Sequence, residues 1–415
     1  MASLSPLAAL LRAEPILVTG MGCVSAAGCS AEALWVAAEE GKSPAVWKEF
    51  EMEGGRGRYA VCEGPDLEAT RTELQPVRKA DRCVQLAWLA AGQAWRGAQL
   101  PGKEASPRVG IMVGSSRGPL GKISDSFAGA GRVRRSPTLA ATSTFASVSG
   151  ALAQGLGVEG PGSMISAACA SGAFAIGLAA EQILLGRADV MLAGGVETPL
   201  HPAVLGQFSA AGILGSHEDA RLACRPFDVT RNGLVPGEGS AFLVLETARS
   251  AERRGVRPLC RLAGWSLHTC RSGRAGVPKD GAGLVHVMRE SMQLAGMTTR
   301  DIGWINAHGS ATVQNDIAEA RAVAEVFGGL AATVPCSSTK PVTGHCLGAT
   351  PALEAVISVQ SLVWQVVPPS ANCHEQDAQC PLHLPRVAMP ARFKSVMSNS
   401  LGFWGYHASL VFSLE

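Results

Sequence analysis

The sequence has little charge of either sign. Only 17% of its 415 residues are Asp, Glu, Lys or Arg, and 36 basic side chains against 34 acidic ones leave a formal net charge of +2. A chain so close to neutrality does not indicate a nucleic-acid partner. Hydrophobic residues make up 47% of the chain, so we expect much of it to form interior or interface.

The cysteine patterns that indicate disulfides or zinc are also missing. Twelve cysteines are spread along the chain without a CxxC pair, which predicts a reduced, cytoplasmic protein and argues against structural zinc. No run of 18 apolar residues is free of Gly, Pro and charge, so we expect no membrane span. Pro6, Arg12 and Glu14 interrupt the apolar start of the chain, so we expect no secretory signal peptide.

At 415 residues the chain is longer than one hydrophobic core usually supports, which predicts two domains or one duplicated fold. Segments of strand length alternate with segments of helical periodicity. Residues 56–73 are polar and irregular, and 117–137 are expected to form an extended loop. The predicted strands are 15–20, 108–114, 164–168, 188–195, 241–246, 257–264, 302–307, 336–338, 395–398 and 408–413; the predicted helices are 31–40, 81–98, 144–156, 169–186, 283–295 and 349–364.

One order of elements occurs twice. A strand, a turn of small residues, a buried helix and further strands run through 161–246 and again through 333–414. This repeat predicts a duplicated α/β unit with a pseudo-two-fold axis. We therefore divide the chain into an N-terminal half, 1–256, and a C-terminal half, 257–415.

Cys169 lies at the turn between a predicted strand and a predicted helix, in the stretch SMISAACASGAFAIG. The first N–H groups of a helix have no partner within the helix and carry the positive end of its dipole, which favours a thiolate. The small neighbours Ala168, Ala170 and Ser171 leave room around the sulfur. Cys169 is thus a candidate nucleophile, although a buried structural cysteine fits the same pattern.

His308 and His345 are each flanked by small residues at the end of a strand or the start of a helix. Under the pseudo-symmetry Cys169 and His345 would occupy equivalent turns that face one centre. A thiolate with two neutral imidazoles suits acyl chemistry, because imidazole N–H groups can hold a thioester oxygen as it gains charge. Lys340 could orient this site or bind a carboxylate.

Two acidic side chains, Asp316 and Glu319, lie on one face of the helix predicted after His308. Either could pair with that histidine. An ordinary buried ion pair is an equally good interpretation of these two carboxylates, and it would still support the site.

Seven stretches of the chain match one known family in order. They are VTGMGCVSAAG (18–28), DRCVQLAW (81–88), SAACASGAFAIG (166–177), RPFDVTRNGLVPGEGS (225–240), NAHGSAT (306–312), STKPVTGHCLGA (338–349) and SNSLGFWGYHASLVF (398–412). With these motifs the chain resembles the β-ketoacyl-[acyl-carrier-protein] synthases of the elongating class. The resemblance implies a thiolase-like α/β fold, with duplicated αβαβα layers in two pseudo-symmetric halves.

The resemblance also implies the reaction. Cys169 would accept an acyl chain from the phosphopantetheine arm of an acyl carrier protein, with the backbone N–H groups of Cys169 and Phe403 as oxyanion hole. His308 and His345 would stabilise the enolate formed when a malonyl carrier thioester loses carbon dioxide, and this enolate would attack the Cys169 thioester in a decarboxylative Claisen condensation. The substrates are carried on the arm, so no cofactor or metal is expected.

Further residues take roles by the same resemblance. Lys340 with Glu319 would hold the catalytic residues in place, Ser310 and Thr312 would bind the pantetheine arm, and Phe403 would be the gate that moves on acylation. We also expect Trp404, beside the gate, to contact substrate. Family members are homodimers, or heterodimers with an inactive chain-length-factor subunit.

Rival members of the fold are less consistent with these motifs. A thiolase would carry a second cysteine in the C-terminal loop, which here reads GFWGYH, and the initiating synthases use Cys-His-Asn. A chain-length factor would lack the nucleophile. A housekeeping fatty-acid elongation enzyme and a non-catalytic partner subunit remain as alternatives.

The chain departs from the family pattern in places. The C-terminal loop is usually GFGGTN, and here Trp404, Tyr406 and His407 replace a glycine, a hydroxyl residue and an amide. Ala311 and Asn315 stand where glycine is common. We interpret these changes as the mark of a specialised synthase that acts on a polyketide, a conjugated polyene or another secondary-metabolite intermediate.

Overall fold

The computed structural model describes residues 5–52, 54–101, 108–127, 137–271 and 280–414. Its centre is one ten-stranded sheet with the strand order β10-β9-β13-β14-β8-β1-β7-β6-β4-β5. The first half of the chain supplies β1 (Ile16–Ser25), β4 (Val109–Gly114), β5 (Gly162–Ile165), β6 (Val190–Glu197) and β7 (Gly239–Thr247); the second supplies β8 (Cys260–Thr269), β9 (Trp304–Asn306), β10 (Cys336–Ser337), β13 (Ser395–Leu401) and β14 (Tyr406–Ser413).

The strand order is symmetric about the pair β8 and β1. Counted outward, β1-β7-β6-β4-β5 on one side corresponds to β8-β14-β13-β9-β10 on the other. The two halves meet through a short antiparallel pairing of Leu17 with Arg261 and of Val18 with Cys260. This topology confirms the predicted duplicated fold.

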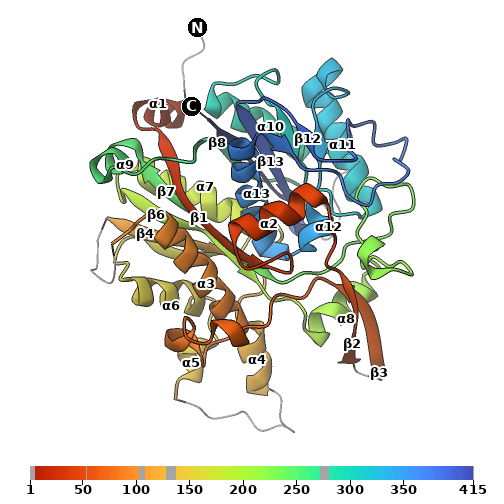
Figure 1. Cartoon of the computed structure of the whole chain (residues 1–415), viewed down its shortest axis with the longest axis horizontal. Helices are drawn as coiled ribbons and strands as arrows, with labels where there is room; N and C mark the ends of the chain where they lie inside the picture. The colour runs from red at the N-terminus through yellow and green to blue at the C-terminus, as the bar shows by residue number, and fades with distance from the viewer. Residues whose placement is uncertain (1–4, 53, 102–107, 128–136, 272–279, 415) are drawn as a thin grey trace.

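Helices form three layers around the two halves of the sheet (Figure 1). The central layer holds α7 (Ser171–Leu184) and α13 (Thr350–Trp364), which contact each other and strands of both halves. The outer layers hold α3 (Arg82–Gly97) with α6 (Ser147–Leu156), and α10 (Ala282–Ala295) with α11 (Val313–Phe327). Three hydrophobic clusters correspond to these layers, which gives the αβαβα arrangement.

The two central helices are apolar because both of their faces are covered. Ile176, Ala179 and Ala180 of α7 are buried in the same cluster as Leu353 and Val356 of α13. A helix that is apolar on all sides belongs in such a core. The segment 347–364, which includes α13, is long and apolar enough to cross a membrane, but 89% of it is buried inside the protein.

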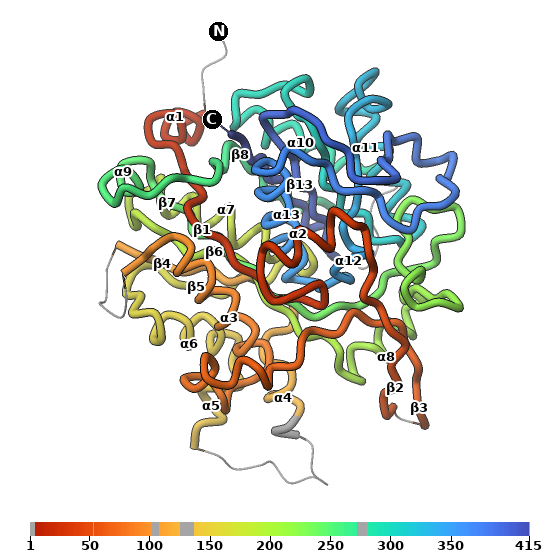
Figure 2. The backbone as a smooth tube through the Cα atoms, viewed as in Figure 1, coloured from red at the N-terminus to blue at the C-terminus, as the bar shows by residue number. Residues whose placement is uncertain are grey.

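The predicted strands and helices are present, with shifted ends, and 31–40 matches α2 (Ala31–Glu40) at both ends. Two predictions of irregular structure were wrong. Residues 56–73 contain most of β3 (Gly55–Val61), which pairs with β2 (Val46–Met52) in a hairpin projecting from the body (Figure 2). The predicted loop 117–137 contains α4 (Leu120–Phe127), and its residues 128–136 lie outside the described part of the chain. The hairpin is largely exposed, so its polar residues show no hydrophobic alternation. The remaining α-helices and strands of the described residues are α1 (Pro6–Ala13), α5 (Leu139–Thr142), α8 (Pro202–Ala210), α9 (Ala248–Arg254), α12 (Lys340–Thr343), β11 (Val366–Val367) and β12 (Met389–Pro390).

Candidate active site

Cys169 lies in a tight turn between β5 and α7. Ala168 before it adopts a left-handed backbone with φ of 49°. The Ser171 hydroxyl stabilises this turn because it accepts from the Ala167 N–H at 2.9 Å and donates to the Ala168 carbonyl at 2.6 Å. Cys169 is 9% exposed and lines a cavity of about 560 Å³.

The thiol of Cys169 is not activated in the way its position predicts. Burial raises the pKa of Cys169 to about 12, against the opposing charges of Lys340 and Arg117, and the carboxylate of Glu197 raises it further. The expectation of a thiolate was therefore wrong for the free protein, because desolvation of the charge is the largest influence on the pKa of Cys169. The sulfur has to lose its proton during the reaction.

His308 and His345 line the same cavity as Cys169. His308 follows β9, and His345 lies between α12 and α13. Their rings meet edge to face, with centroids 5.4 Å apart. Cys169, which is more than 130 residues from either histidine in the sequence, thus shares one cavity with both imidazoles.

Lys340 determines which nitrogen of His308 carries the proton. Its side chain is completely buried, and Nζ lies 2.7 Å from Glu354 Oε1, 3.4 Å from His308 Nδ1 and against the His308 carbonyl oxygen. An ammonium group can only donate, so Nδ1 accepts and the proton lies on Nε2. Burial, Lys340 and His345 lower the pKa of His308 well below its ordinary value. His308 is therefore neutral.

His345 is held by a hydroxyl group and by its backbone. Its Nδ1 lies 3.0 Å from Thr350 Oγ1. Its N–H donates to the Val235 carbonyl at 2.7 Å, and its carbonyl accepts from the Gly237 N–H at 3.1 Å. Burial and then Lys340 lower the pKa of His345 well below its ordinary value. Both rings are consequently uncharged at neutral pH.

Glu319 positions the backbone of His308, and does not contact its ring. Its two carboxylate oxygens accept from the N–H groups of His308 at 2.8 Å and Gly309 at 2.7 Å. Burial raises the pKa of Glu319 to about 7. The side chain that neutralises Lys340 is Glu354, which the sequence reasoning missed. The indication in the sequence was that Glu354 is the single acidic residue in the apolar helix α13.

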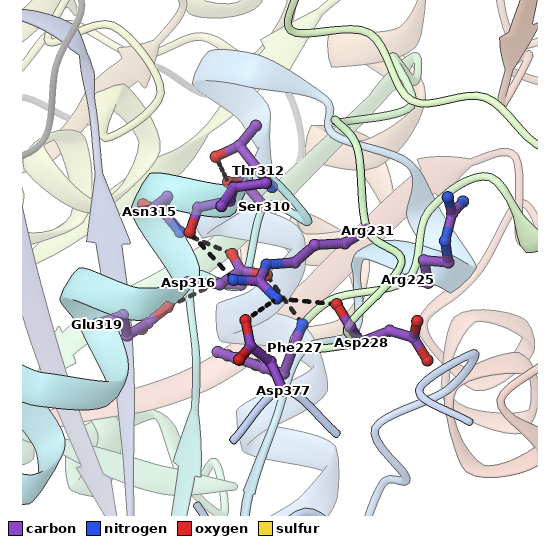
Figure 3. Close-up of polar contacts among 12 residues, drawn as sticks. Arg225, Phe227, Asp228, Arg231, Ser310, Thr312, Asn315, Asp316, Glu319 and Asp377 are labelled. Carbon is purple, nitrogen blue, oxygen red and sulfur yellow. Dashed lines mark hydrogen bonds and ion pairs between the residues drawn. The ribbon is translucent and has the colours of Figure 1, made fainter. Parts of the chain in front are cut away.

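Asp316 also does not pair with His308. It accepts from the Phe227 N–H at 2.9 Å and lies 3.4 Å from Arg231 Nε. Arg231 is almost fully buried and also donates to Asp377 at 2.7 Å and to the Asp228 carbonyl at 2.8 Å. Figure 3 shows this network beneath Ser310 and Thr312. It attaches the loop 225–238 to the first turn of α11.

Ser310, Thr312 and Phe403 line the cavity as well. The hydroxyl oxygens of Ser310 and Thr312 lie 2.8 Å apart. Gly402 packs so tightly on the nucleophile turn that a Cβ there would lie 3.2 Å from the Cys169 nitrogen. In the described part of the chain, the N–H groups of Cys169 and Phe403 bond to no other backbone group, so both are available to an oxyanion.

Trp404 is not among the residues that line this cavity, and it is 58% exposed. Its φ of 63° is left-handed, as is the φ of 64° at Ala311. Glycine takes this conformation without strain, which agrees with the glycine that the resemblance leads us to expect at both positions. Tyr406 steadies the loop by packing edge to face on Phe174, with ring centroids 5.7 Å apart.

Two family models cover most of the chain. Residues 13–251 match the β-ketoacyl synthase N-terminal domain, and residues 259–374 match the C-terminal domain. The chain belongs to the β-ketoacyl synthase family. It is therefore an acyltransferase of the condensing type.

Named relatives of this synthase come from two kinds of pathway. It is 34% identical to a putative polyketide β-ketoacyl synthase 1 of Streptomyces halstedii, over 95% of this chain and 97% of that one. It is 32% identical to the 3-oxoacyl-[acyl-carrier-protein] synthase 2 of Staphylococcus aureus, over 96% of this chain and 97% of that one.

Solved structures agree with this assignment. A type II polyketide ketosynthase, described as in complex with its acyl-carrier protein and bound to the hexaketide, has a TM-score of 0.87 and 29% identity, covering 97% of this chain and 99% of that one. The ishigamide ketosynthase/chain length factor has a TM-score of 0.86 and 29% identity, with the same coverage.

The Arg231 network should be essential for the stability of the synthase. Arg231→Met would leave the buried Asp316 and the mostly buried Asp377 without their cation, so we expect the free energy of unfolding in urea to fall by about 3–5 kcal/mol. Arg221→Met, which breaks the exposed pair with Asp219, should change it by less than about 1 kcal/mol. Equal losses in the two variants would contradict this interpretation.

The neutral histidines predict a pH dependence of stability. Below about pH 6.5 His345 gains a proton in the unfolded state but not in the folded state, so the unfolded state binds more protons. The free energy of unfolding therefore falls by up to about 1.4 kcal/mol for each unit by which the pH is lowered. His345→Asn should reduce this slope in urea titrations between about pH 7 and pH 5. His374→Asn, at an exposed position, should not. An unchanged slope in His345→Asn would show that the folded ring also takes up the proton.

Proposed function

We propose that this synthase extends an acyl chain held on Cys169 with a malonyl unit, both delivered by an acyl carrier protein. The observation that carries the proposal is the shared cavity of Cys169, His308 and His345, with both rings neutral. A neutral imidazole keeps one N–H group that can donate to an oxygen that gains charge, whereas a ring displaced from the cavity could not reach that oxygen.

The first step is thioester exchange. The Cys169 sulfur attacks the acyl carbonyl, the carbon–sulfur bond to the phosphopantetheine thiol breaks, and the Cys169 proton passes to the departing sulfur. The N–H groups of Cys169 and Phe403 hold the oxygen of the tetrahedral intermediate. Acylation removes the ionisable thiol, so the high pKa of Cys169 is no obstacle to the second step.

The second step forms the carbon–carbon bond. N–H groups of His308 and His345 donate to the malonyl thioester oxygen while the carboxyl group leaves as carbon dioxide. The resulting enolate carbon attacks the Cys169 thioester, and the bond from the acyl carbon to the Cys169 sulfur breaks. The sulfur leaves as a thiolate and takes up a proton from solvent, and the product is a β-ketoacyl carrier longer by two carbons. The electron pair comes from the carbon–carboxylate bond, so we propose that the reaction needs no resident cofactor or metal.

The remaining site residues take supporting roles in this proposal. Lys340 and Glu319 position His308, and Ser310 and Thr312 bind the pantetheine arm. Phe403 is the gate, and it packs in the same apolar cluster as Cys169. We assign Trp404 to the exposed approach to the gate, where it would contact the arm or the carrier and not the acyl chain.

We propose the acyl carrier protein as partner, together with a second copy of the chain or a chain-length-factor-like subunit. The solved relatives include complexes of both kinds. Arg78 and Lys79 are exposed and could contact the acidic carrier, whereas Arg82 is paired with Glu238 at 2.9 Å. The sequence has a second basic cluster, Arg132, Arg134 and Arg135, which lies outside the described residues. We propose that the protein is cytoplasmic. We also propose that residues 1–256 and 257–415 form the two halves of the duplicated fold.

For the pathway, we propose specialised polyketide or polyene biosynthesis over housekeeping fatty-acid elongation. The similarity to a polyketide synthase and the altered C-terminal loop support this choice. A non-catalytic partner subunit is the second candidate, because Trp404 gives the gate loop a strained residue. The retained nucleophile argues against it.

A pair of variants separates the two chemical steps. Cys169→Ala should retain no label from a radiolabelled acyl carrier but still decarboxylate malonyl carrier, because both histidines remain. His308→Ala should retain the label and condense at least about 100-fold more slowly. Cys29→Ala, at an exposed cysteine, should behave as the unmodified chain does. If the unmodified chain acquires no label, it is a partner subunit.

A further inference from the structure

Arg117 stands out because it is a cation in the wall of the cavity that holds Cys169. It lies in the turn between β4 and α4. Its backbone N–H donates to Glu197 Oε1 at 2.9 Å, which fixes the start of the side chain. Its guanidinium lies over the ring of Phe208, 5.9 Å from the centroid.

The guanidinium of Arg117 has no acid to neutralise it in the described part of the chain. The nearby carboxylate, Glu197, is fully occupied by hydrogen bonds from the hydroxyl groups of Ser115 and Ser116 and from the backbone N–H groups of Ser116, Arg117 and Gly348. Arg117 therefore has five N–H donors and a single aromatic contact.

Around Arg117 the cavity is largely apolar. Phe208, Leu234 and Leu347 form one hydrophobic cluster with Cys169, and Ile213 packs against it. An acyl chain on Cys169 would extend among these side chains and displace water from the guanidinium. Arg117 is partly buried, and a plain alkyl chain beside it would cover more of the guanidinium without offering a hydrogen-bond partner, which is unfavourable.

We propose that Arg117 is a specificity-determining residue that selects acyl chains bearing an acceptor oxygen beyond the thioester, a carboxylate above all. A carboxylate would satisfy the guanidinium through two charge-assisted hydrogen bonds, and a keto oxygen would satisfy it in part. This inference rests on the proposed acylation of Cys169. It concerns the chain that is accepted and not the condensation itself.

The test compares acyl carriers of one carbon number whose chains end in a methyl group, contain a β-keto group, or end in a carboxylate. The rate at which each acylates Cys169 is followed by intact-protein mass. We expect the unmodified protein to prefer the carboxylated chain over the alkyl chain by at least about tenfold, with the keto chain between them. Arg117→Met should reverse the order of the carboxylated and alkyl chains, and Arg117→Lys should retain a weakened preference.

Alkylation of Cys169 by iodoacetamide distinguishes selectivity from thiol activation, since the charge of Arg117 also acts on the sulfur. Arg117→Met could slow the alkylation of Cys169 and its acylation by all three chains by the same factor. Arg117 would then activate the thiol, and the inference would be overturned. The inference is also overturned if the ratios of the acylation rates of the three chains are the same in the unmodified protein and in Arg117→Met. The proposed function stands in that case. Failure of every chain to acylate Cys169 in the unmodified protein would instead reject the proposed function.

Discussion

The buried ammonium group of Lys340 is the charge on which the geometry of the site depends. It is enclosed completely and neutralised by Glu354 at 2.7 Å, and its remaining donors face the Nδ1 and the carbonyl of His308. A buried cation without such partners would be very costly. The ion pair therefore ties α13 to the loop after β9. It also places the His308 proton on the nitrogen that can face a substrate, and it helps to keep both imidazoles neutral.

The duplicated fold explains why distant segments reach this point. The turns before α7 and α13 are related by the symmetric strand order, and they deliver Cys169 and His345 to one cavity that residues of both halves of the chain line. His308 comes from the loop after β9, which Glu319 holds by its backbone. Each reactive side chain is thus supported by a different buried contact.

The sequence predicted the fold and the positions of the reactive residues because both depend on local patterns and on motifs. Helix 31–40 and the apolar helices after Cys169 and His345 follow from periodicity alone. Which buried charged groups pair with one another could not be predicted, because this depends on how the helices are rotated when they pack. Glu354 rather than Glu319 neutralises Lys340 for this reason, and Asp316 bonds to the loop at Phe227. The raised pKa of Cys169 also reflects burial, which the apolar pattern around it allowed but did not distinguish from an activated thiol.

The most direct test of this account is nitrogen NMR of the His308 ring in the unmodified synthase, with His308→Asn used to assign its signals. The account predicts a neutral ring at about pH 7, with an unprotonated Nδ1 and a protonated Nε2. Loss of this tautomer preference is expected in Lys340→Met. A ring that is doubly protonated, or that carries its proton on Nδ1, would contradict the central role given to Lys340.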